Sequence, residues 1–310
     1  MHHLHALIRG VVLPEFRVIY VPVPKAACTT LLWLIADAAG LDSQRFAKSP
    51  APEVAPALTV HDLNLWPKSH RMRDRGEGWL REASNDPEWL LFSVVRDPLP
   101  RVWSAWQSKL LLREPTFIWR FGEADWFPRV PFSAQGVVED FRRFVRTLTR
   151  GEPLFEGHWH PQNELLQPSV FNYAHIGRVE ALPDTIALLT ERGLPCADSM
   201  ARPGRENRAP LSFHPSVIDG DLSARISEFY AVDCETFGYA GSGDEQGATW
   251  ADFSDWMDRT EAAIPALRDI VQRNVRVGQL SGTLQGRPDW VVHWPKVESR
   301  RSASTLRESK

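Results

Sequence analysis

A lysine followed by small and hydroxylated residues lies where an apolar segment meets an expected helix. The stretch Pro24–Thr30, PKAACTT, follows the apolar run Phe16–Pro24. N–H groups at a helix N-terminus attract an anion, and Lys25 adds positive charge. The hydroxyls of Thr29 and Thr30 offer further hydrogen bonds. We expect a phosphate site here, and a plain helix start with an incidental lysine is the alternative. The candidate binding residues of this turn are Pro24, Lys25, Ala26, Ala27, Cys28, Thr29 and Thr30.

A second cationic turn, RDPLPRVWSAW, follows the apolar segment that ends at Val95. Arg96 lies at the expected strand end, and Arg101 and Ser104 lie in the first turns of an expected helix. The planar donors of arginine suit a phosphate dianion, and a serine on the same helix face can add a hydroxyl. The alternative is a surface pair of Arg96 with Asp97 and a solvated Arg101. Two anion sites at adjacent strand ends favour the binding interpretation.

The elements that must position these turns follow from the hydrophobic pattern. The β-branched run 16–24 indicates a buried strand, and 29–40 has helix formers between a hydroxyl and a glycine. A second strand ends at residue 95 and leads into a helix over 99–112. Two such joints predict an α/β fold with a parallel, P-loop-like sheet flanked by helices. Further helices are expected over 137–149, 183–192, 215–230 and 250–276, with a strand within 171–179.

The bulk composition is that of a soluble globular chain with no general affinity for polyanions. Hydrophobic residues make up 43% and charged residues 24% of 310 positions, and the formal net charge is −3. We therefore expect no nucleic acid partner, and a phosphate site must be built locally. Cys28, Cys196 and Cys234 form no C-x-x-C pair, and no apolar stretch is long enough to span a bilayer. The interpretation is a cytoplasmic protein without a membrane span.

Two motifs of nucleotide and metal enzymes are missing from the sequence. The first turn contains no glycine and places its lysine before the small residues, unlike the nucleotide-triphosphatase loop G-x-x-x-x-G-K-S/T. Carboxylates and histidines do not occur together at metal-ligand spacing. We therefore expect no metal site.

Four stretches resemble a known family, the sulfotransferases that use 3′-phosphoadenosine-5′-phosphosulfate (PAPS). PKAACTT resembles the 5′-phosphosulfate loop P-K-V-A-C-S/T-N of the carbohydrate branch, which includes chondroitin, dermatan and HNK-1 enzymes. RDPLPRVWSAWQSKL resembles the 3′-phosphate motif of that branch. HWHPQNELLQPSVFNYAHIGRVEAL and ISEFYAVDCETFGY are similar to two later motifs, so the resemblance covers about Arg17 to Tyr239. Leu166 and Ser169 stand where secretory-pathway members carry two cysteines, which fits a reducing compartment.

The resemblance implies the sulfotransferase fold and a PAPS molecule that lies across the two turns. The phosphosulfate would bind at Pro24–Thr30, and the 3′-phosphate would bind at Arg96 and Ser104, with Arg101 in the same motif. Transfer of a sulfuryl group to a hydroxyl is an in-line displacement, which requires positioning, an acceptor base and stabilisation of the leaving phosphate. Lys25 is placed for the last role.

The base is assigned less directly, because several histidines are candidates: His61 first, His158 second, and His70 and His160 after them. His61 lies between the two turns, in a region that often supplies a histidine base in related enzymes. His158 lies in the motif-like stretch GHWHP and is the second candidate, either as the base or facing the acceptor. For each of them a packed or solvated imidazole is the alternative. Arg205 and Arg208 lie in a segment that often closes over the nucleotide, and they are further candidates for a phosphate or an anionic acceptor.

The sequence thus predicts a sulfotransferase domain over 1–240, and 241–310 as a linker, a helical extension and a polar tail. The expected acceptor is a hydroxyl of a carbohydrate or a glycosylated metabolite, and Trp119, Trp126 and Trp159 are candidates for lining its site. One alternative is a nucleotide-dependent phosphotransferase, which the missing motifs disfavour. Another is a nucleotide- or glycan-binding module without catalysis. The oligomeric state stays open.

Overall fold

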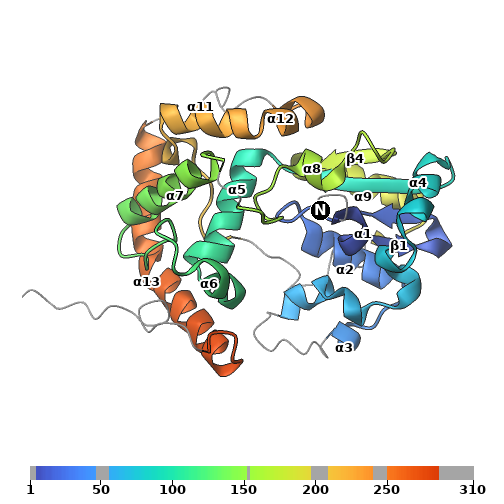
Figure 1. Cartoon of the computed structure of the whole chain (residues 1–310), viewed down its shortest axis with the longest axis horizontal. Helices are drawn as coiled ribbons and strands as arrows, with labels where there is room; N and C mark the ends of the chain where they lie inside the picture. Colours follow the sequence, from blue (N-terminus) through green and yellow to red (C-terminus); the bar gives the residue numbers. More distant parts are fainter. Residues whose placement is uncertain (1–4, 47–55, 152–153, 197–208, 240–249, 286–310) are drawn as a thin grey trace, which may run out of the picture.

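The molecule consists of a sheet half and a helical half that lie side by side (Figure 1). The computed structural model describes residues 5–46, 56–151, 154–196, 209–239 and 250–285. The sheet half contains a four-stranded sheet with helices on both faces. The helical half is built around a separate apolar cluster. The predicted α/β class is therefore confirmed, with a large helical part beside the sheet.

The sheet has the order β1-β2-β3-β4, in which β1 is antiparallel to β2 and the other neighbours are parallel. Its strands are β1 (Val11–Leu13), β2 (Val18–Tyr20), β3 (Leu90–Val95) and β4 (His175–Arg178). The predicted strand over 16–24 is shorter in the structure, and β1 was not predicted. Phe16 ends a 3-10 turn, η1 (Pro14–Phe16), and Arg17 has a φ of 50°, so the chain reverses direction between β1 and β2.

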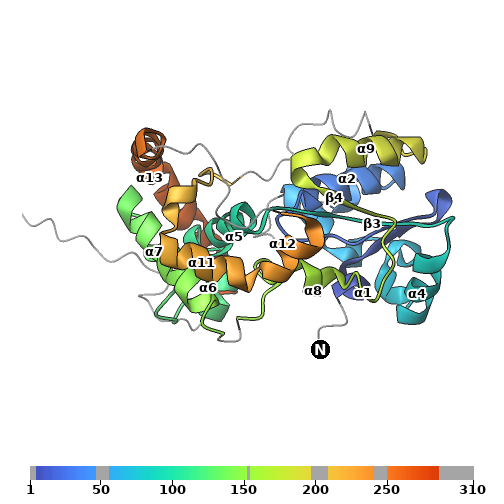
Figure 2. The ribbon, with the colours of Figure 1, turned by 90° about the horizontal axis from the view of Figure 1, so that it is seen from above.

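Helices cover both faces of the sheet (Figure 2). One face carries α2 (Cys28–Ala38) and α9 (Leu182–Glu191), and the other carries α1 (His5–Arg9), α4 (Glu77–Asn85) and α8 (Gln162–Leu166). Successive residues of a strand point to opposite faces. In β3, Phe92 and Val94 accordingly join the cluster under α2, while Leu91 and Val95 join the cluster under α4. A strand buried on both sides explains the continuous apolar run.

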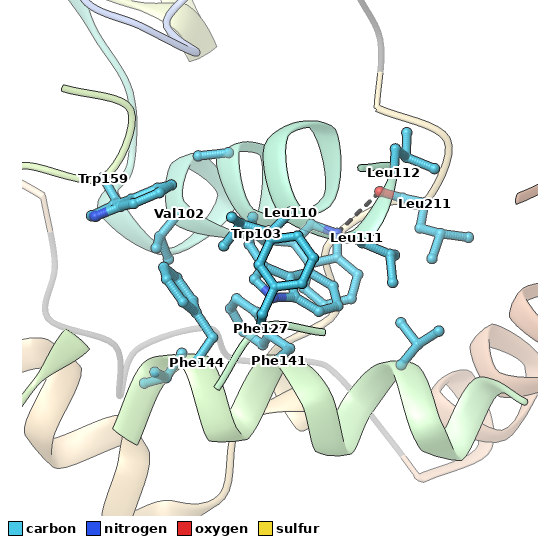
Figure 3. Packing of buried hydrophobic residues seen from close by; sticks show 14 of the residues in the cluster. Val102, Trp103, Leu110, Leu111, Leu112, Phe127, Phe141, Phe144, Trp159 and Leu211 are labelled. Carbon is cyan, nitrogen blue, oxygen red and sulfur yellow. Dashed lines mark hydrogen bonds between the residues drawn. The ribbon is translucent and has the colours of Figure 1, made fainter. Parts of the chain in front are cut away.

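The helical half begins where β3 leads into α5 (Pro98–Trp106). Its other elements are the π-helical turn η6 (Gln107–Leu111), α6 (Pro115–Phe121), α7 (Ala134–Leu148), α11 (Gly220–Phe229) and α13 (Trp250–Leu280). Figure 3 shows their shared core, in which Trp103 packs edge-on against Phe141. The indole N–H of Trp103 donates to the Leu211 carbonyl over 3.1 Å, so its polar atom is satisfied inside the core.

The long C-terminal helix α13 packs into this same core rather than forming one of its own. Trp256, Leu267 and Val271 of α13 are buried in the cluster around Trp103. Its polar side chains also bind neighbouring elements, since the Asn274 amide donates to the Leu112 carbonyl at 2.7 Å. The predicted helix over 250–276 is confirmed, and the packing makes it part of the helical half.

The remaining elements are short and connect the larger ones. They are α3 (Ser43–Phe46), α12 (Ala231–Phe237), η2 (Pro56–His61), η3 (Leu63–Leu65), η4 (Lys68–His70), η5 (Met72–Asp74), η7 (Val179–Ala181) and η8 (Pro215–Val217). The helices predicted over 137–149 and 183–192 correspond to α7 and α9. The helix predicted over 215–230 is divided into η8 and α11. In the described part of the chain, none of the helices has the length and apolar character needed to cross a bilayer.

Candidate active site

The first predicted turn is a tight loop that leaves the N-terminus of α2 open. Lys25 and Ala27 have φ angles of 68° and 55°, in the left-handed region that residues other than glycine rarely adopt. Among the described residues, no side chain caps α2 at Ala27, although the first N–H groups of a helix lack partners within the helix. These N–H groups are therefore available to an anion, and such backbone strain is typical of functional loops.

The ammonium group of Lys25 lies close to the helical half. Its Nζ donates to Ser108 Oγ of η6 over 3.1 Å. Burial, followed by the charge of Lys109, lowers the pKa of Lys25 to about 8. Lys25 is therefore a cation at neutral pH, and no carboxylate of the described residues forms an ion pair with it. A buried cation without an acidic partner is a site that an anion would stabilise.

The second predicted turn lies beside the first, because β2 and β3 are parallel neighbours. Arg96 Nη1 lies 3.4 Å from the carbonyl oxygen of Lys25, so both cations are at one edge of the sheet. The backbone of Arg96 is fixed by the buried side chain of Gln162, which accepts from its N–H at 3.0 Å and donates to its carbonyl at 2.8 Å. Ser104, only 5% exposed, follows on α5. The structure thus brings Lys25 and Arg96, which were predicted to hold the two ends of one donor, to one edge of the sheet.

Arg101 differs from its predicted role as a phosphate ligand. Its side chain is fully buried, and it donates to three backbone carbonyls. Nε bonds to Pro24 at 3.1 Å, Nη1 to His160 at 2.9 Å and Nη2 to Gly157 at 2.9 Å. Because these carbonyls use its nitrogens, Arg101 joins the first turn to the loop that carries His158. We therefore assign it a positioning role.

His61 lies against the first turn. Its Nε2 is 2.9 Å from Thr29 Oγ1, so the histidine orients a hydroxyl at the start of α2. Burial lowers the pKa of His61 to about 3, and the charges of Lys109, Arg9 and Lys25 act in the same direction. His61 is therefore a neutral imidazole in a cationic environment.

The charges of Lys25 and Lys109, which act on His61, also act on His158. Its Nδ1 is 2.7 Å from Glu156 Oε1, and its ring packs edge-on against Phe117 of α6 at 5.5 Å. Burial lowers the pKa of His158 to about 3, with Lys109 and Lys25 contributing to the lowering and Glu156 opposing it. The two candidate bases thus share the lysines but differ in that only His158 has a carboxylate partner among the described residues.

The segment that ends the sheet half holds this loop in place. The Tyr230 hydroxyl donates to the Trp159 carbonyl, and Asp233 accepts from the N–H groups of Gln162 and Asn163 at 2.8 and 2.7 Å. Asp233 is fully buried, so it caps the N-terminus of α8 and fixes the residue that holds Arg96. The stretch ISEFYAVDCETFGY therefore supports both turns.

Three residues of the site were not predicted: Ser108, Lys109 and Glu156. Ser108 could have been predicted from the sequence, because Arg101, Ser104 and Ser108 fall at helical spacing on one face of an apolar helix. Lys109 is the last but one residue of the quoted motif, and it lies in the π-helical turn with its Nζ 5.4 Å from the ring centroid of Phe117. Glu156 had no signal, since it lies in an irregular loop fixed by contacts distant in sequence.

The remaining candidates are placed differently. Trp126 and Trp159 belong to the core, with 9% and 0% exposure, so neither lines an acceptor site. Trp119 on α6 is 52% exposed and stays a candidate. Arg205 and Arg208 lie outside the described residues. Within the described ranges, no group of three or more His, Cys, Asp and Glu side chains is arranged to hold a metal ion.

The fold and this site define a class of protein. The sulfotransferase family model matches residues 9–240, and the chain belongs to that family. Among curated proteins, carbohydrate sulfotransferase 12 of Xenopus laevis is 27% identical over 247 residues, covering 72% of this chain and 58% of the relative. Carbohydrate sulfotransferase 14 of Danio rerio is 23% identical over 248 residues, covering 73% and 60%. The chain thus spans about three fifths of the length of these relatives. No solved structure gives a significant match.

Proposed function

We propose that this protein is a PAPS-dependent sulfotransferase that transfers the sulfuryl group to a hydroxyl of a carbohydrate or a glycosylated metabolite. The observation that carries the proposal is the single edge at which Lys25, the open start of α2 and Arg96 meet. Among the described residues, neither Lys25 nor Arg96 forms an ion pair with a carboxylate, which suits a donor that carries phosphate at two positions. The family membership of residues 9–240 supports the same donor.

The residues of the site fit an in-line displacement. PAPS supplies the sulfuryl group, and its bisphosphorylated nucleotide leaves. Lys25 and the N–H groups at the start of α2 would stabilise the charge that develops on the leaving phosphate. His61 would hold the Thr29 hydroxyl toward the transferred group, since its Nε2 lies 2.9 Å from Oγ1. A histidine would accept the proton of the acceptor hydroxyl.

A carbohydrate acceptor is supported by the relatives, both of which are named carbohydrate sulfotransferases. Trp119 of α6 is 52% exposed and lies two residues after Phe117, whose ring packs against His158. Exposed indole rings provide flat apolar surfaces against which sugar rings can pack. The proposal therefore places the sugar near α6.

We also propose that the protein works in a reducing compartment such as the cytoplasm. Cys28, Cys196 and Cys234 are all free thiols in the structure. Cys28 lies in the first turn itself, where a thiol adjoins the proposed phosphosulfate site. Proteins of oxidising compartments more often pair their cysteines.

The deciding experiment is a calorimetric titration with 3′-phosphoadenosine-5′-phosphate (PAP) and with ATP, followed by transfer of labelled sulfate from PAPS to a panel of glycosides and unsulfated chondroitin. We expect PAP to bind more tightly than ATP. Lys25→Ala should abolish transfer and weaken PAP binding, because it removes the cation beside the open helix start. Lys68→Ala is the matched control, because Lys68 is an exposed lysine of η4.

The outcomes separate the alternatives. A preference for ATP over PAP would contradict the proposed donor and favour a phosphotransferase. PAP binding without transfer to any acceptor would favour a binding module. Transfer that persists in Lys25→Ala at the wild-type rate would remove Lys25 from the mechanism.

A further inference from the structure

The loop 154–160 carries a histidine whose two ring nitrogens have different surroundings. Nδ1 of His158 lies 2.7 Å from Glu156 Oε1. An ionised carboxylate can only accept hydrogen bonds, so Nδ1 carries the proton and Nε2 keeps its lone pair in the neutral ring. Among the described residues, none is within hydrogen-bond distance of Nε2. The His158 side chain is 24% exposed, so an acceptor can reach it.

The carboxylate that orients His158 is itself held by an arginine. Arg120 Nη1 donates to Glu156 Oε2 at 2.7 Å, and Nη2 donates to the Phe155 carbonyl at 2.6 Å. Burial alone would raise the pKa of Glu156, but the hydrogen bond and charge of His158, together with Arg120, hold it below its usual value. Glu156 is therefore ionised and fixed between a cation and the imidazole.

The His158 ring also lies near the cations of the donor site. Phe117 contacts both groups, because its centroid is 5.5 Å from the His158 ring and 5.4 Å from Lys109 Nζ. The charged groups that act on His158 are Glu156 from its own loop, Lys109 from η6 and Lys25 from the first turn. A bound anionic donor would offset the two lysines and so strengthen His158 as a base.

His61 is less suited to accept a proton. Its Nε2 is already engaged with Thr29 Oγ1, and the charged groups that act on it are the cations Lys109, Arg9 and Lys25. A general base gains a positive charge as it works. At His61 that charge would form among cations without a stabilising carboxylate, whereas at His158 Glu156 is in direct contact.

We propose that His158 is the general base of the reaction and that Glu156 and Arg120 are positioning residues that fix its tautomer. This inference rests on the proposed function. Nε2 of His158 accepts the proton of the acceptor hydroxyl while the hydroxyl oxygen bonds to sulfur. The bond between sulfur and the bridging oxygen of the donor breaks, and its electron pair stays on the phosphate. The imidazolium then returns its proton to solvent.

The first test observes the tautomer directly and needs no acceptor. Histidine ring signals of the ¹⁵N-labelled protein are recorded near neutral pH, and His158 is assigned by its loss in His158→Gln. We expect the Nδ1–H tautomer in the wild type and a mixture of tautomers in Glu156→Gln. An Nε2–H tautomer in the wild type would overturn the proposal. PAP binding by the same sample tests the proposed function. The tautomer and PAP binding are separate results, so the proposed base and the proposed function can be contradicted independently.

The second test measures kcat for transfer of labelled sulfate. We expect His158→Gln to lower kcat by about 10²–10⁴-fold with unchanged PAP affinity. Glu156→Gln should lower kcat by a smaller factor and move the acidic limb of the kcat profile to lower pH, because the carboxylate that raises the pKa of His158 is lost. Arg120→Gln should act in the same direction and more weakly. A merely structural role for Glu156 would leave the limb in place.

The matched control is the neighbouring histidine–carboxylate pair. His160 Nε2 lies 2.8 Å from Glu164 Oε2, so this ring resembles His158 in sequence position and partner but has its Nε2 engaged. His160→Gln should leave kcat unchanged. A greater loss of kcat in His61→Gln than in His158→Gln would assign the base to His61 and overturn the proposal.

Discussion

The two sides of the candidate site hold their cations with different partners. On the sheet side, Lys25 bonds to a serine hydroxyl and Arg96 to a backbone carbonyl, at 3.1 and 3.4 Å. On the helical side, Lys109 and Arg120 each form an ion pair with a glutamate, at 2.5 and 2.7 Å. Cations with neutral partners keep their charge for a bound anion, whereas paired cations orient a carboxylate. The first arrangement suits donor binding, and the second suits the control of a base.

The comparison shows that a donor site and a general base need different electrostatic surroundings. A donor site has to gain stability when an anion arrives, and among the described residues neither Lys25 nor Arg96 forms an ion pair with a carboxylate. A base has to gain stability when it takes up a proton, so its surroundings supply a carboxylate. Arg101 connects the two sites, because one side chain binds Pro24 of the first turn and Gly157 of the loop.

The largest effect is expected from replacing Arg101, which would break the connection between the halves. Arg101→Met leaves three partly buried carbonyls without this donor and should lower the free energy of unfolding by about 3–5 kcal/mol. Arg101→Lys should also destabilise, because an ammonium cannot reach three divergent carbonyls. Thermal and denaturant unfolding measure the loss.

The matched variant is Arg96→Lys, at the other arginine of the same turn. It should weaken PAP binding and change stability little, because the bond from the Arg96 side chain to the Lys25 carbonyl is long, at 3.4 Å. If Arg101 is a phosphate ligand, as the sequence predicts, the pattern would be different. Arg101→Lys would then keep the wild-type stability and lose PAP affinity.

The sheet half was the more predictable part of the molecule, for physical reasons. The apolar run of β3 and the small residues before α2 are local signals, so strand, turn and helix could be predicted in order. The reversal at Arg17 was not visible, because a left-handed residue other than glycine gives no compositional signal. The helices 137–149 and 250–276 were found from their periodicity, which is independent of what they pack against.

The parts of the site that depend on local sequence could be predicted, and the parts that depend on distant contacts could not. Lys25 and Arg96 follow strands directly, so their meeting at one edge follows from a parallel sheet. Arg101 was assigned to a ligand role because its burial depends on the distant loop 157–160. Glu156 is fixed by Arg120, on a helix far away in sequence, so no local pattern indicated the pair.

We expect a change of pH to have an effect of intermediate size on PAP affinity. This effect would test whether the cation Lys25 binds the donor through its charge. Burial and Lys109 lower the pKa of Lys25 to about 8, so Lys25 loses its charge as pH rises through that value. A bound phosphate favours the charged form, so PAP affinity should be retained below about pH 8 and fall up to tenfold per pH unit above it. Calorimetry in buffers of different ionisation enthalpy should show proton uptake on binding.

The control for this pH effect is Lys25→Arg. A guanidinium stays charged over the whole range, so the loss of affinity above about pH 8 should disappear. The weakening would instead belong to another group if Lys25→Arg kept the same slope.

The smallest effect is expected on the helical side, where α13 supports the π-helical turn that carries Lys109. The Asn274 amide donates to the Leu112 carbonyl at 2.7 Å, directly after that turn. Asn274→Ala should lower the free energy of unfolding by about 1 kcal/mol, because one partly buried hydrogen bond is lost. PAP affinity should not change, since Asn274 bonds to Leu112 rather than to a residue of either turn, while kcat should fall slightly as Lys109 loses support. Gln272→Ala, exposed on the same helix, should change neither quantity. Loss of PAP affinity in Asn274→Ala with kcat preserved would show that α13 acts on the donor side and would contradict this division between the halves.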